Sequence, residues 1–402
     1  MKITGIVAEY NPFHMGHEYQ LKKAKELSSC DGIVVVMSGN YVQRGEPAII
    51  DKFKRAEASI YGGADLVIEL PMPFSFQNAD MFANAAIKEL KKLPVNALSF
   101  GCESTNTSLL KDIATLQLDE KFNAAIKNEI KGGISYPKAL SMVIGAFLGE
   151  EAFKAAGSPN NVLGIEYIKS TIKHHLDWDF VPVQRMGKEH NDILSTGYYD
   201  SATAIRKVLL NSLNSNISIT EKSKEMIFKF YETHNKFNNL NNYLDILYYK
   251  IIDMGRENLK NIYEVTEGLN NKIYSNAFKH NSIDDFILAL KSKRYTYSKL
   301  RRMMLNILLG ITYNDINDFM LTNDNYVKVL AFNDVGRQII KEAKSNGTAI
   351  INRFSDYKKN NLLAEDIPLF KLTDRATNIY NLPLNNRTLN QEYELNSIYV
   401  KI

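Results

Sequence analysis

The chain has 402 residues, of which 45% are hydrophobic and 23% charged, a composition typical of a globular protein with two or three domains and not of a disordered or fibrous chain. Its net charge of +4 permits a nucleic-acid partner without requiring one, and its two cysteines are too few for a disulfide framework. Because no apolar run approaches the roughly 20 residues that cross a bilayer, we expect a cytoplasmic protein without a membrane partner.

Short β-branched runs alternate with helical patterns in the first 210 residues. Strands are predicted at residues 2–8, 32–38, 65–70, 97–101 and 178–184. Helices are predicted between them at residues 17–28, 51–61 and 77–93. Apolar strands separated by helices indicate a parallel sheet covered on both faces, so we predict a Rossmann-like α/β nucleotide-binding domain over residues 1–210. A helix-rich stretch at 106–157 is expected to be an insertion into this domain.

The sequence changes character after residue 210. Asn, Lys and Tyr become frequent, and helical periodicity dominates as far as residue 321. Residues 324–402 combine a short apolar run at 327–332, a helix at 335–345 and a tail rich in Leu and Asn. We predict a mainly helical second domain, 211–402, that begins in the polar stretch 211–219.

A histidine-containing turn, His14-Met15-Gly16-His17, lies between the first predicted strand and the first predicted helix. Unpaired N–H groups at a helix N-terminus favour anions, and two imidazoles there can donate hydrogen bonds to phosphate oxygens. Fixed donors stabilise the charge that builds on those oxygens when a nucleophile attacks phosphorus. We therefore predict that His14 and His17 are catalytic and act on the α-phosphate of ATP. The alternative is a pair of surface histidines beside a tight turn.

A second phosphate-binding signature is expected at Asp200-Ser201-Ala202-Thr203-Ala204-Ile205-Arg206, which has the pattern of a helix start. Ser201 and Thr203 offer hydroxyls, and Arg206 follows about one turn later. Arginine can grip phosphate oxygens with two parallel hydrogen bonds. The alternative is a capped helix with a surface arginine.

Two further groups of polar residues have both a functional and a structural interpretation. The loop Gln43-Arg44-Gly45-Glu46 follows the second strand and is a candidate for binding acetate or an acceptor base, or else is a surface loop. Lys52, Lys54 and Arg55 on the next helix are interpreted as solvated charges, with contact to RNA phosphate as the alternative.

A basic segment of the second half, residues 291–302, is the candidate RNA contact. Its cations neutralise phosphates and its tyrosines can stack on bases, although a solvated helix face would have the same composition. The residues predicted to bind tRNA are Lys293, Arg294, Lys299, Arg301 and Arg302.

The sequence of residues 5–17, with its Asn-Pro-Phe-His-Met-Gly-His core, resembles the nucleotidyltransferase superfamily that has HIGH-type motifs. More narrowly, it is similar to the bacterial tRNA(Met) cytidine acetate ligase family. Further similarity to that family lies at residues 37–48, 64–71, 99–103 and 159–167. The resemblance spans most of the chain and is more specific before residue 212 than after it.

The resemblance implies a set of ATP contacts. Gly101, one or other of Asn160 and Asn161, and Arg185 are expected at the nucleotide, and Ser201, Thr203 and Arg206 at its β- and γ-phosphates. The family commonly continues from Arg185 as Arg-Ile-Gly-Ala-Gly-Tyr, whereas this chain has Arg-Met-Gly-Lys-Glu-His, which puts a role for the residues after Arg185 in doubt. The expected contacts around the histidine turn are Val7, Ala8, Glu9, Tyr10, Asn11, Pro12, Phe13, His14, Met15, Gly16 and His17.

The same resemblance implies ATP-dependent acetylation of a tRNA base. Acetate would attack the α-phosphate of ATP, and the acetyl-adenylate would acetylate the wobble cytidine of elongator tRNA(Met) to N(4)-acetylcytidine. The residues alone indicate only an adenylate-forming or nucleotidyl-transferring enzyme. The alternatives are a nucleotidyltransferase that joins AMP to a small phosphorylated substrate and an RNA-binding protein that has kept a nucleotide pocket. No acidic metal cluster stands out, and the sequence leaves open whether Mg²⁺ accompanies ATP.

Overall fold

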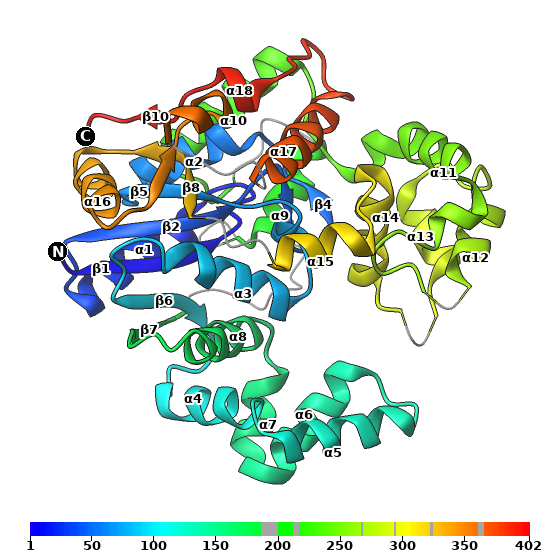
Figure 1. The fold of residues 1–402 in the computed structure, drawn as a ribbon, viewed down its shortest axis with the longest axis horizontal. Coiled ribbons are helices and arrows are strands. Elements are labelled where there is room, and N and C mark those ends of the chain that lie inside the picture. Colours follow the sequence, from blue (N-terminus) through cyan, green and yellow to red (C-terminus); the bar gives the residue numbers. More distant parts are fainter. Residues whose placement is uncertain (186–199, 212–216, 267, 293–294, 322–324, 361–365) are drawn as a thin grey trace.

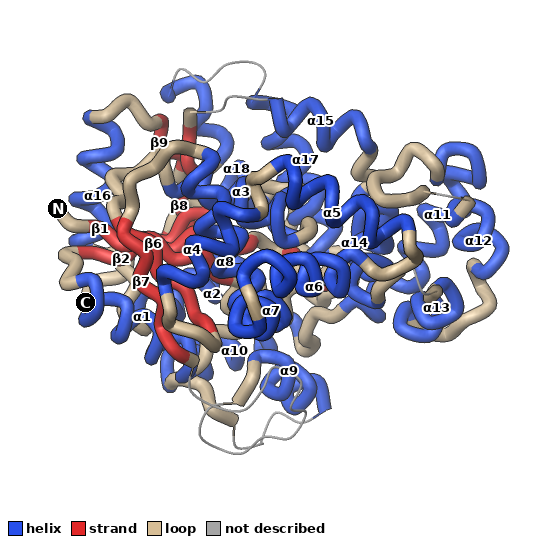
Figure 2. Tube along the Cα trace, turned by 90° about the horizontal axis from the view of Figure 1, so that it is seen from below, coloured by secondary structure: helices blue, strands red, loops and turns tan. Residues whose placement is uncertain are grey.

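A computed structural model describes residues 1–185, 200–211, 217–266, 268–292, 295–321, 325–360 and 366–402. An eight-stranded sheet lies at its centre (Figures 1 and 2) in the order β10-β8-β5-β2-β1-β6-β7, with β9 pairing with β8. Five of these strands are parallel and correspond to the five predicted ones: β1 (Ile3–Ala8), β2 (Gly32–Ser38), β5 (Leu66–Leu70), β6 (Ala97–Cys102) and β7 (Asp179–Gln184).

Helices cover both faces of this sheet, which confirms the predicted α/β fold. Side chains alternate across a strand, so Ile33 and Val35 of β2 pack into one core with α1 and α2, whereas Val34 and Val36 pack into another with α3 and α8. These helices are α1 (Met15–Ser28), α2 (Lys52–Tyr61), α3 (Ala79–Leu90) and α8 (Pro159–Lys173).

The stretch predicted as an insertion is helical and forms a lobe at the bottom of Figure 1. It packs against α8, and its own core includes Ile113, Phe122 and Ile144. Its helices are α4 (Thr107–Leu116), α5 (Glu120–Lys131), α6 (Tyr136–Leu148) and α7 (Glu150–Gly157).

Most of the second half is helical, and one group of helices forms the lobe at the right of Figures 1 and 2. That lobe contains α11 (Leu244–Leu259), α12 (Leu269–Asn276), α13 (Ile283–Leu290) and α14 (Tyr297–Leu309). Helix α9 (Ala202–Asn211) ends the first half, and the other helices of the second half are α10 (Glu221–His234), α15 (Tyr313–Leu321), α16 (Asp334–Ser345), α17 (Asp366–Asn381) and α18 (Gln391–Glu394).

The second half also extends the central sheet. The apolar run near residue 330 is β8 (Tyr326–Phe332), which pairs antiparallel with β5 and carries β9 (Ala349–Ile351) and β10 (Ile398–Tyr399) beside it. The boundary expected near residue 210 lies after α9, and the sheet takes strands from both sides of it. The division into two domains stays a prediction.

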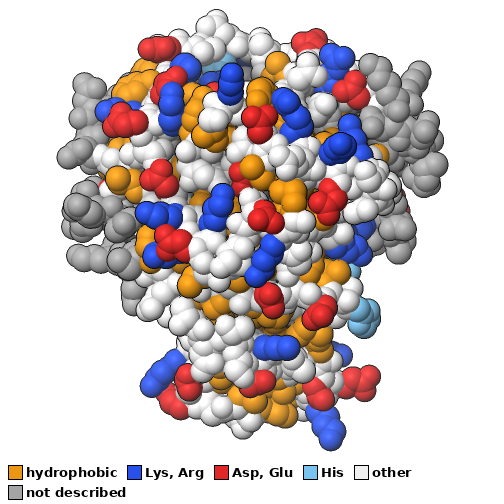
Figure 3. Space-filling view, turned by 90° about the vertical axis from the view of Figure 1, so that its left-hand side faces the viewer, with side chains coloured by type: hydrophobic (Ala, Val, Ile, Leu, Met, Phe, Trp, Pro, Cys, Tyr) orange, Lys and Arg blue, Asp and Glu red, His pale blue; other side chains and the backbone are white. Residues whose placement is uncertain are grey.

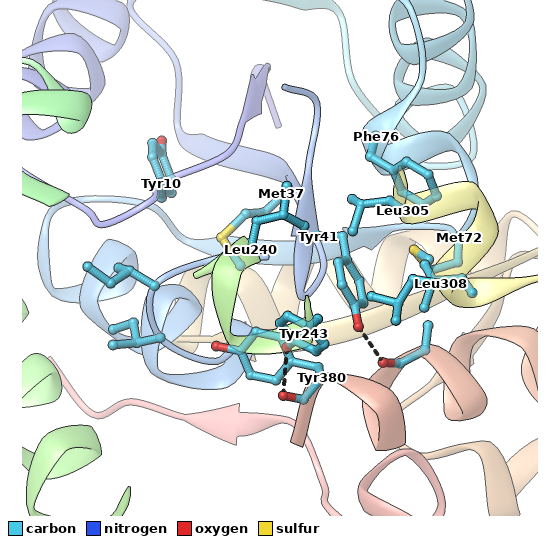
Figure 4. Packing of buried hydrophobic residues seen from close by; sticks show 14 of the residues in the cluster. Tyr10, Met37, Tyr41, Met72, Phe76, Leu240, Tyr243, Leu305, Leu308 and Tyr380 are labelled. Carbon is cyan, nitrogen blue, oxygen red and sulfur yellow. Dashed lines mark hydrogen bonds between the residues drawn. The ribbon is translucent and has the colours of Figure 1, made fainter. Parts of the chain in front are cut away.

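One hydrophobic core joins the two halves, as Figure 4 shows at close range. Tyr41 belongs to the short hairpin of β3 (Tyr41–Val42) and β4 (Glu46–Pro47), and its hydroxyl donates to the carbonyl of Ala376 in α17 at 3.2 Å. The Tyr243 hydroxyl donates to the carbonyl of Tyr380 at 2.9 Å. The bond from Tyr41 holds α17 directly on the sheet domain, although the two partners are 335 residues apart in the sequence.

The face of the molecule on which the two termini lie carries no large patch of one charge among the residues that the structure describes (Figure 3). In Figure 3, acidic and basic side chains are interspersed over the residues that the structure describes. None of the helices in the described ranges is long and apolar enough to cross a membrane.

Candidate active site

The sheet has a topological switch point at β1. The chain runs from β1 to β2 and β5 on one side and to β6 and β7 on the other, and ligands of such sheets bind where the carboxyl ends of the strands diverge. A cavity of about 350 Å³ lies at that edge. Most residues expected at the nucleotide line it: Val7, Ala8, Glu9, Tyr10, Asn11, His14, Gly16, His17, Gly101, Asn160, Arg185, Ser201, Thr203 and Arg206.

Both histidines of the turn are fixed by the backbone of α1. The His14 side chain caps the helix, because its Nδ1 accepts from the Gly16 N–H at 3.1 Å. The Nδ1 of His17 accepts from the His14 N–H at 3.3 Å, and the two rings stack with centroids 3.6 Å apart. A Cβ on Gly16 would come within 3.0 Å of the His14 ring, so glycine makes this arrangement possible.

Burial keeps the two rings neutral, and these hydrogen bonds determine which nitrogen carries the proton. Burial lowers the pKa of His14 to about 3, and burial followed by the neighbouring His14 lowers the pKa of His17 well below its ordinary value. Both rings are therefore neutral at pH 7. Since each Nδ1 is an acceptor, each neutral ring carries its proton on Nε2. The turn thus offers two Nε2–H donors beside the N-terminus of α1.

Other residues of the turn hold its shape and do not line the cavity. Pro12 follows a cis peptide bond, and Phe13 is fully buried in the space that Gly62 leaves beside it. Met15 is 41% exposed. The Asn11 side chain, which does reach the cavity, also accepts from the Ile49 N–H at 2.8 Å and ties the turn to the chain before α2.

The structure distinguishes between the two adjacent asparagines. Asn161 is 1% exposed, and its Oδ1 accepts from the N–H groups of Glu103 and Ser104 at 2.9 and 3.1 Å. It therefore fixes the loop after β6 and lies behind the cavity wall. Asn160 lines the cavity instead, where its Oδ1 accepts from Nη1 of Arg185 at 2.8 Å.

The two arginines of the cavity come from different elements. Arg185 follows β7 and lies over Gly101, where an added Cβ would be 3.5 Å from the Arg185 Cγ. Arg206 of α9 donates to the carbonyl of Asn11 at 2.9 Å and pairs with Glu46 at 2.7 Å. The two guanidinium groups also help to keep His14 neutral, after the larger effect of burial.

The start of α9 carries the two hydroxyls that were predicted. The Ser201 Oγ accepts from the Ala204 N–H at 3.2 Å, and the Thr203 Oγ1 accepts from Nη2 of Arg206 at 3.4 Å. Asp200, at the same helix start, accepts from the Ser218 N–H and hydroxyl at 3.2 and 3.0 Å.

The five candidate RNA contacts lie on α14 or just before it, and the environments of those that the structure describes differ. Lys293 and Arg294 fall outside the described residues. Lys299 is half-buried, with its Nζ 5.3 Å from the centre of the Tyr295 ring. Arg301 pairs at 2.9 Å with Glu46, the partner of Arg206, and Arg302 is 9% exposed and pairs with Glu264 at 3.5 Å. An ionic link therefore runs from the cavity through Glu46 to α14.

Two charges expected in solvent are buried. Lys52 and Arg55 of α2 are fully buried, so their interpretation as solvated charges is wrong. Lys52 lies between two carboxylates, and Arg55 donates to the carbonyls of Glu9, Ser38 and Gly39. Both side chains point inward, which a helical pattern rich in Lys and Arg does not reveal.

Two further groups of residues line the cavity. Gln43 and Arg44, in the turn between β3 and β4, belong to the loop that was a candidate for binding acetate or an acceptor base. Arg44 is half-buried there and has no ion-pair partner among the described residues. The apolar and aromatic part of the wall, which no motif indicated, consists of Tyr19, Ala79, Phe82, Phe100, Val162, Leu163 and Tyr167.

The described residues hold no group of three or more His, Cys, Asp or Glu side chains placed as metal ligands. Cys30 and Cys102 are free and buried. Burial raises the pKa of the Cys102 thiol to about 12.

A Rossmann-type sheet with a His-X-Gly-His turn at its switch point, faced by two arginines, defines a nucleotide-binding enzyme of the nucleotidyltransferase class. The HIGH Nucleotidyl Transferase family matches residues 1–394. The tRNA(Met) cytidine acetate ligase of Clostridium perfringens is 37% identical over 414 residues, covering 100% of this chain and 98% of the relative. That of Clostridium botulinum is 36% identical over 405 residues, covering 98% and 97%.

Two crystal structures of Thermotoga maritima TmcAL, each 30% identical, match over 100% of both chains. The apo form has a TM-score of 0.94, and the form bound with alpha-thio ATP has a TM-score of 0.92. The chain belongs to the HIGH nucleotidyltransferase family and, within it, to the tRNA(Met) cytidine acetate ligases.

Proposed function

We propose that this protein is an ATP-dependent acetate ligase. It activates acetate as acetyl-adenylate and acetylates the wobble cytidine of elongator tRNA(Met) to N(4)-acetylcytidine. The observation that carries the proposal is the pair of stacked, neutral imidazoles with both Nδ1 atoms occupied at the start of α1. The names of the relatives, and the ATP analogue in the Thermotoga maritima structure, support the choice of substrates.

In the first step an acetate oxygen attacks the α-phosphorus of ATP, and the bond to the bridging oxygen breaks to release pyrophosphate. The Nε2–H groups of His14 and His17 donate to the α-phosphate oxygens, where negative charge increases in the transition state. Arg206, with the hydroxyls of Ser201 and Thr203, binds the departing phosphates. Arg185, Gly101 and Asn160 hold the nucleoside on the β6 side of the cavity.

In the second step the exocyclic amine of cytidine attacks the acetyl carbon and AMP leaves. A covalent enzyme intermediate is not needed, because the acetyl group is already activated. The raised pKa of Cys102 keeps its thiol protonated at pH 7 and unsuited to act as a nucleophile. A tRNA substrate places the reaction in the cytoplasm, and Lys299 of α14 is our candidate for contact with its phosphates.

The decisive experiment incubates the pure protein with ATP, labelled acetate and bulk bacterial tRNA, followed by nucleoside analysis. We expect labelled N(4)-acetylcytidine that requires both ATP and acetate. A parallel reaction with His17→Asn is the matched control for a contaminating activity. If no acetylcytidine forms while ATP is cleaved to pyrophosphate with a small phosphorylated acceptor, the protein is instead a small-molecule nucleotidyltransferase.

A further inference from the structure

Acetyl transfer to cytidine releases a proton, because N4 carries two hydrogens before the reaction and one after it. The group that accepts this proton must have a free lone pair within reach of the amine. His14 and His17 do not qualify, because each Nδ1 already accepts a backbone N–H and each Nε2 carries the ring proton. Tyr10 and Tyr167 do not qualify either, since burial raises the pKa of both hydroxyls far above neutrality.

Two carboxylates line the cavity among the residues that the structure describes, Glu9 and Asp200. Asp200 is 5% exposed and engaged by the Ser218 N–H and hydroxyl, so it fixes the chain before α10. Glu9 directly follows the last residue of β1 and lies in the same cavity as both imidazoles. Its Oε1 accepts from the Gln43 N–H at 2.8 Å, while Oε2 has no hydrogen-bond partner among the described residues.

We propose that Glu9 is the general base of the acetyl-transfer step, a role that rests on the function proposed above. The lone pair of N4 forms the new bond to the acetyl carbon, and the bond from that carbon to the phosphate oxygen breaks. AMP leaves with the electron pair of the broken bond. One N4 proton passes to the free Oε2 of Glu9, which returns it to water before the next turnover.

The surroundings of Glu9 make its carboxylate a stronger base than a solvated one. Burial has the largest effect and raises the pKa of Glu9, Glu46 raises it further, and Arg44 and Arg206 oppose the rise. Arg55, which donates to the backbone carbonyl of Glu9, also belongs to this group of charges. A carboxylate whose pKa is shifted toward the working pH is a better proton acceptor than a solvated one.

The test separates the two half-reactions in Glu9→Gln. Gln can still accept from the Gln43 N–H and fills the same space, but it cannot take a proton. Because Glu9 also lines the nucleotide cavity, and Gln keeps its size and its bond to Gln43, we expect acetate-dependent exchange of pyrophosphate into ATP to fall much less than acetyl transfer. Single-turnover transfer from preformed acetyl-adenylate to tRNA should fall on the order of 10²- to 10⁴-fold, the usual contribution of a general base.

A pH profile gives a second readout that a merely structural role would not change. In the wild type, the transfer rate should rise with pH as Glu9 loses its proton and then level off, and Glu9→Gln should lose this rise. Glu120→Gln is the matched control, because this carboxylate is exposed on α5 in the insertion. Both half-reactions should keep their wild-type rates in that variant.

Three results have distinct meanings. Wild-type transfer rates in Glu9→Gln would overturn the assignment. Equal losses of exchange and transfer would also overturn it, because they would place Glu9 in nucleotide binding. If the wild-type protein itself shows no acetate-dependent exchange, the proposed function fails, and this is visible before any variant is made.

Discussion

Charged side chains lie away from solvent in two regions of this molecule, and the regions differ in whether these charges are paired with one another. In the cavity, Arg44 has no ion-pair partner among the described residues, and Glu9 keeps one oxygen without a hydrogen bond. In the core beside β5, the Lys52 ammonium lies 2.6 Å from Glu69 and 2.5 Å from Glu392, and all three side chains are almost fully buried. The first arrangement leaves polar atoms for a ligand, whereas the second pairs opposite charges with one another.

The location of the core cluster explains why its charges are paired. Lys52 lies on α2, Glu69 on β5 and Glu392 on α18, and the Thr377 hydroxyl of α17 donates to Glu392 at 2.6 Å. A buried charge without a partner is costly, so the cluster is stable only when all these elements are in place. It therefore joins the end of the chain to the sheet, whereas Arg44 in the cavity makes no such link among the described residues.

The largest effect on stability is expected for Lys52→Met. The substitution leaves Glu69 buried without its cation and Glu392 with only Lys328, 3.9 Å away, which should lower the free energy of unfolding by about 3–5 kcal/mol. Urea unfolding measures the loss. Lys54→Met is the matched control on the same helix, because the Lys54–Asp51 pair is partly exposed and should contribute below about 1 kcal/mol. Equal losses in the two variants would show that the core cluster does not hold the fold together.

The largest effect on catalysis is expected for His17→Ala. Removing one Nε2–H donor should lower the rate of acetate-dependent pyrophosphate exchange by about 10²- to 10³-fold, as for other donors to a developing charge. Stability should fall by only about 1 kcal/mol, since a capping interaction is lost. His174→Ala, at the end of α8 and outside the cavity, is the control. Full exchange activity in His17→Ala would refute the catalytic assignment.

The pH dependence of stability should differ between the wild type and His14→Asn. The folded pKa of His14 is about 3, below the ordinary 6.5 of the unfolded chain, so between these values only the unfolded state binds the proton. The free energy of unfolding therefore falls as the pH decreases through this window. Asn keeps a helix-capping oxygen but does not titrate, so the wild type should lose about 2 kcal/mol more than the variant between pH 7 and pH 5.

Urea unfolding at both pH values measures this difference. An equal pH dependence in the two proteins would mean that folding does not lower the pKa of His14. In the same window, pyrophosphate exchange by the wild type should show no inflection near pH 6.5, because both imidazoles are already neutral there.

The features that depend on local sequence pattern could be predicted from the sequence alone. Five parallel strands, the helices between them and the position of the histidine turn follow from apolar runs and from the order of elements. The distinction between Asn160 and Asn161 was out of reach, because it depends on a loop after β6 about 57 residues away. Likewise, the burial of Lys52 requires Glu392, 340 residues further along the chain. Long-range pairing of this kind leaves no periodic signal in the sequence.

The placement of β8 in the sheet could not be predicted either, because it also depends on pairing between distant segments. Its apolar run was visible, but an antiparallel strand added to the edge of a parallel sheet is set by the pairing with β5 and not by the run itself. The aromatic and apolar wall of the cavity was also missed, since Phe100 and Tyr167 have the same pattern as other core residues of β6 and α8.

The smallest expected effect is on tRNA binding by α14. This helix has one cation without an ion-pair partner in the described part of the chain and one that is buried and paired, so the contrast between the cavity and the core cluster can be tested again within a single helix. No carboxylate of the described residues pairs with Lys299, whereas Arg302 is buried and paired with Glu264. We expect Lys299→Ala to weaken tRNA binding a few-fold and to lower the salt dependence of log Kd by about one unit, the signature of one lost phosphate contact. Arg302→Met should instead lower stability, because Glu264 loses its partner. Filter binding of tRNA at several salt concentrations measures the first effect, with the KM for ATP as the control that should not change. An unaltered salt dependence in Lys299→Ala would place the tRNA contact elsewhere on the molecule.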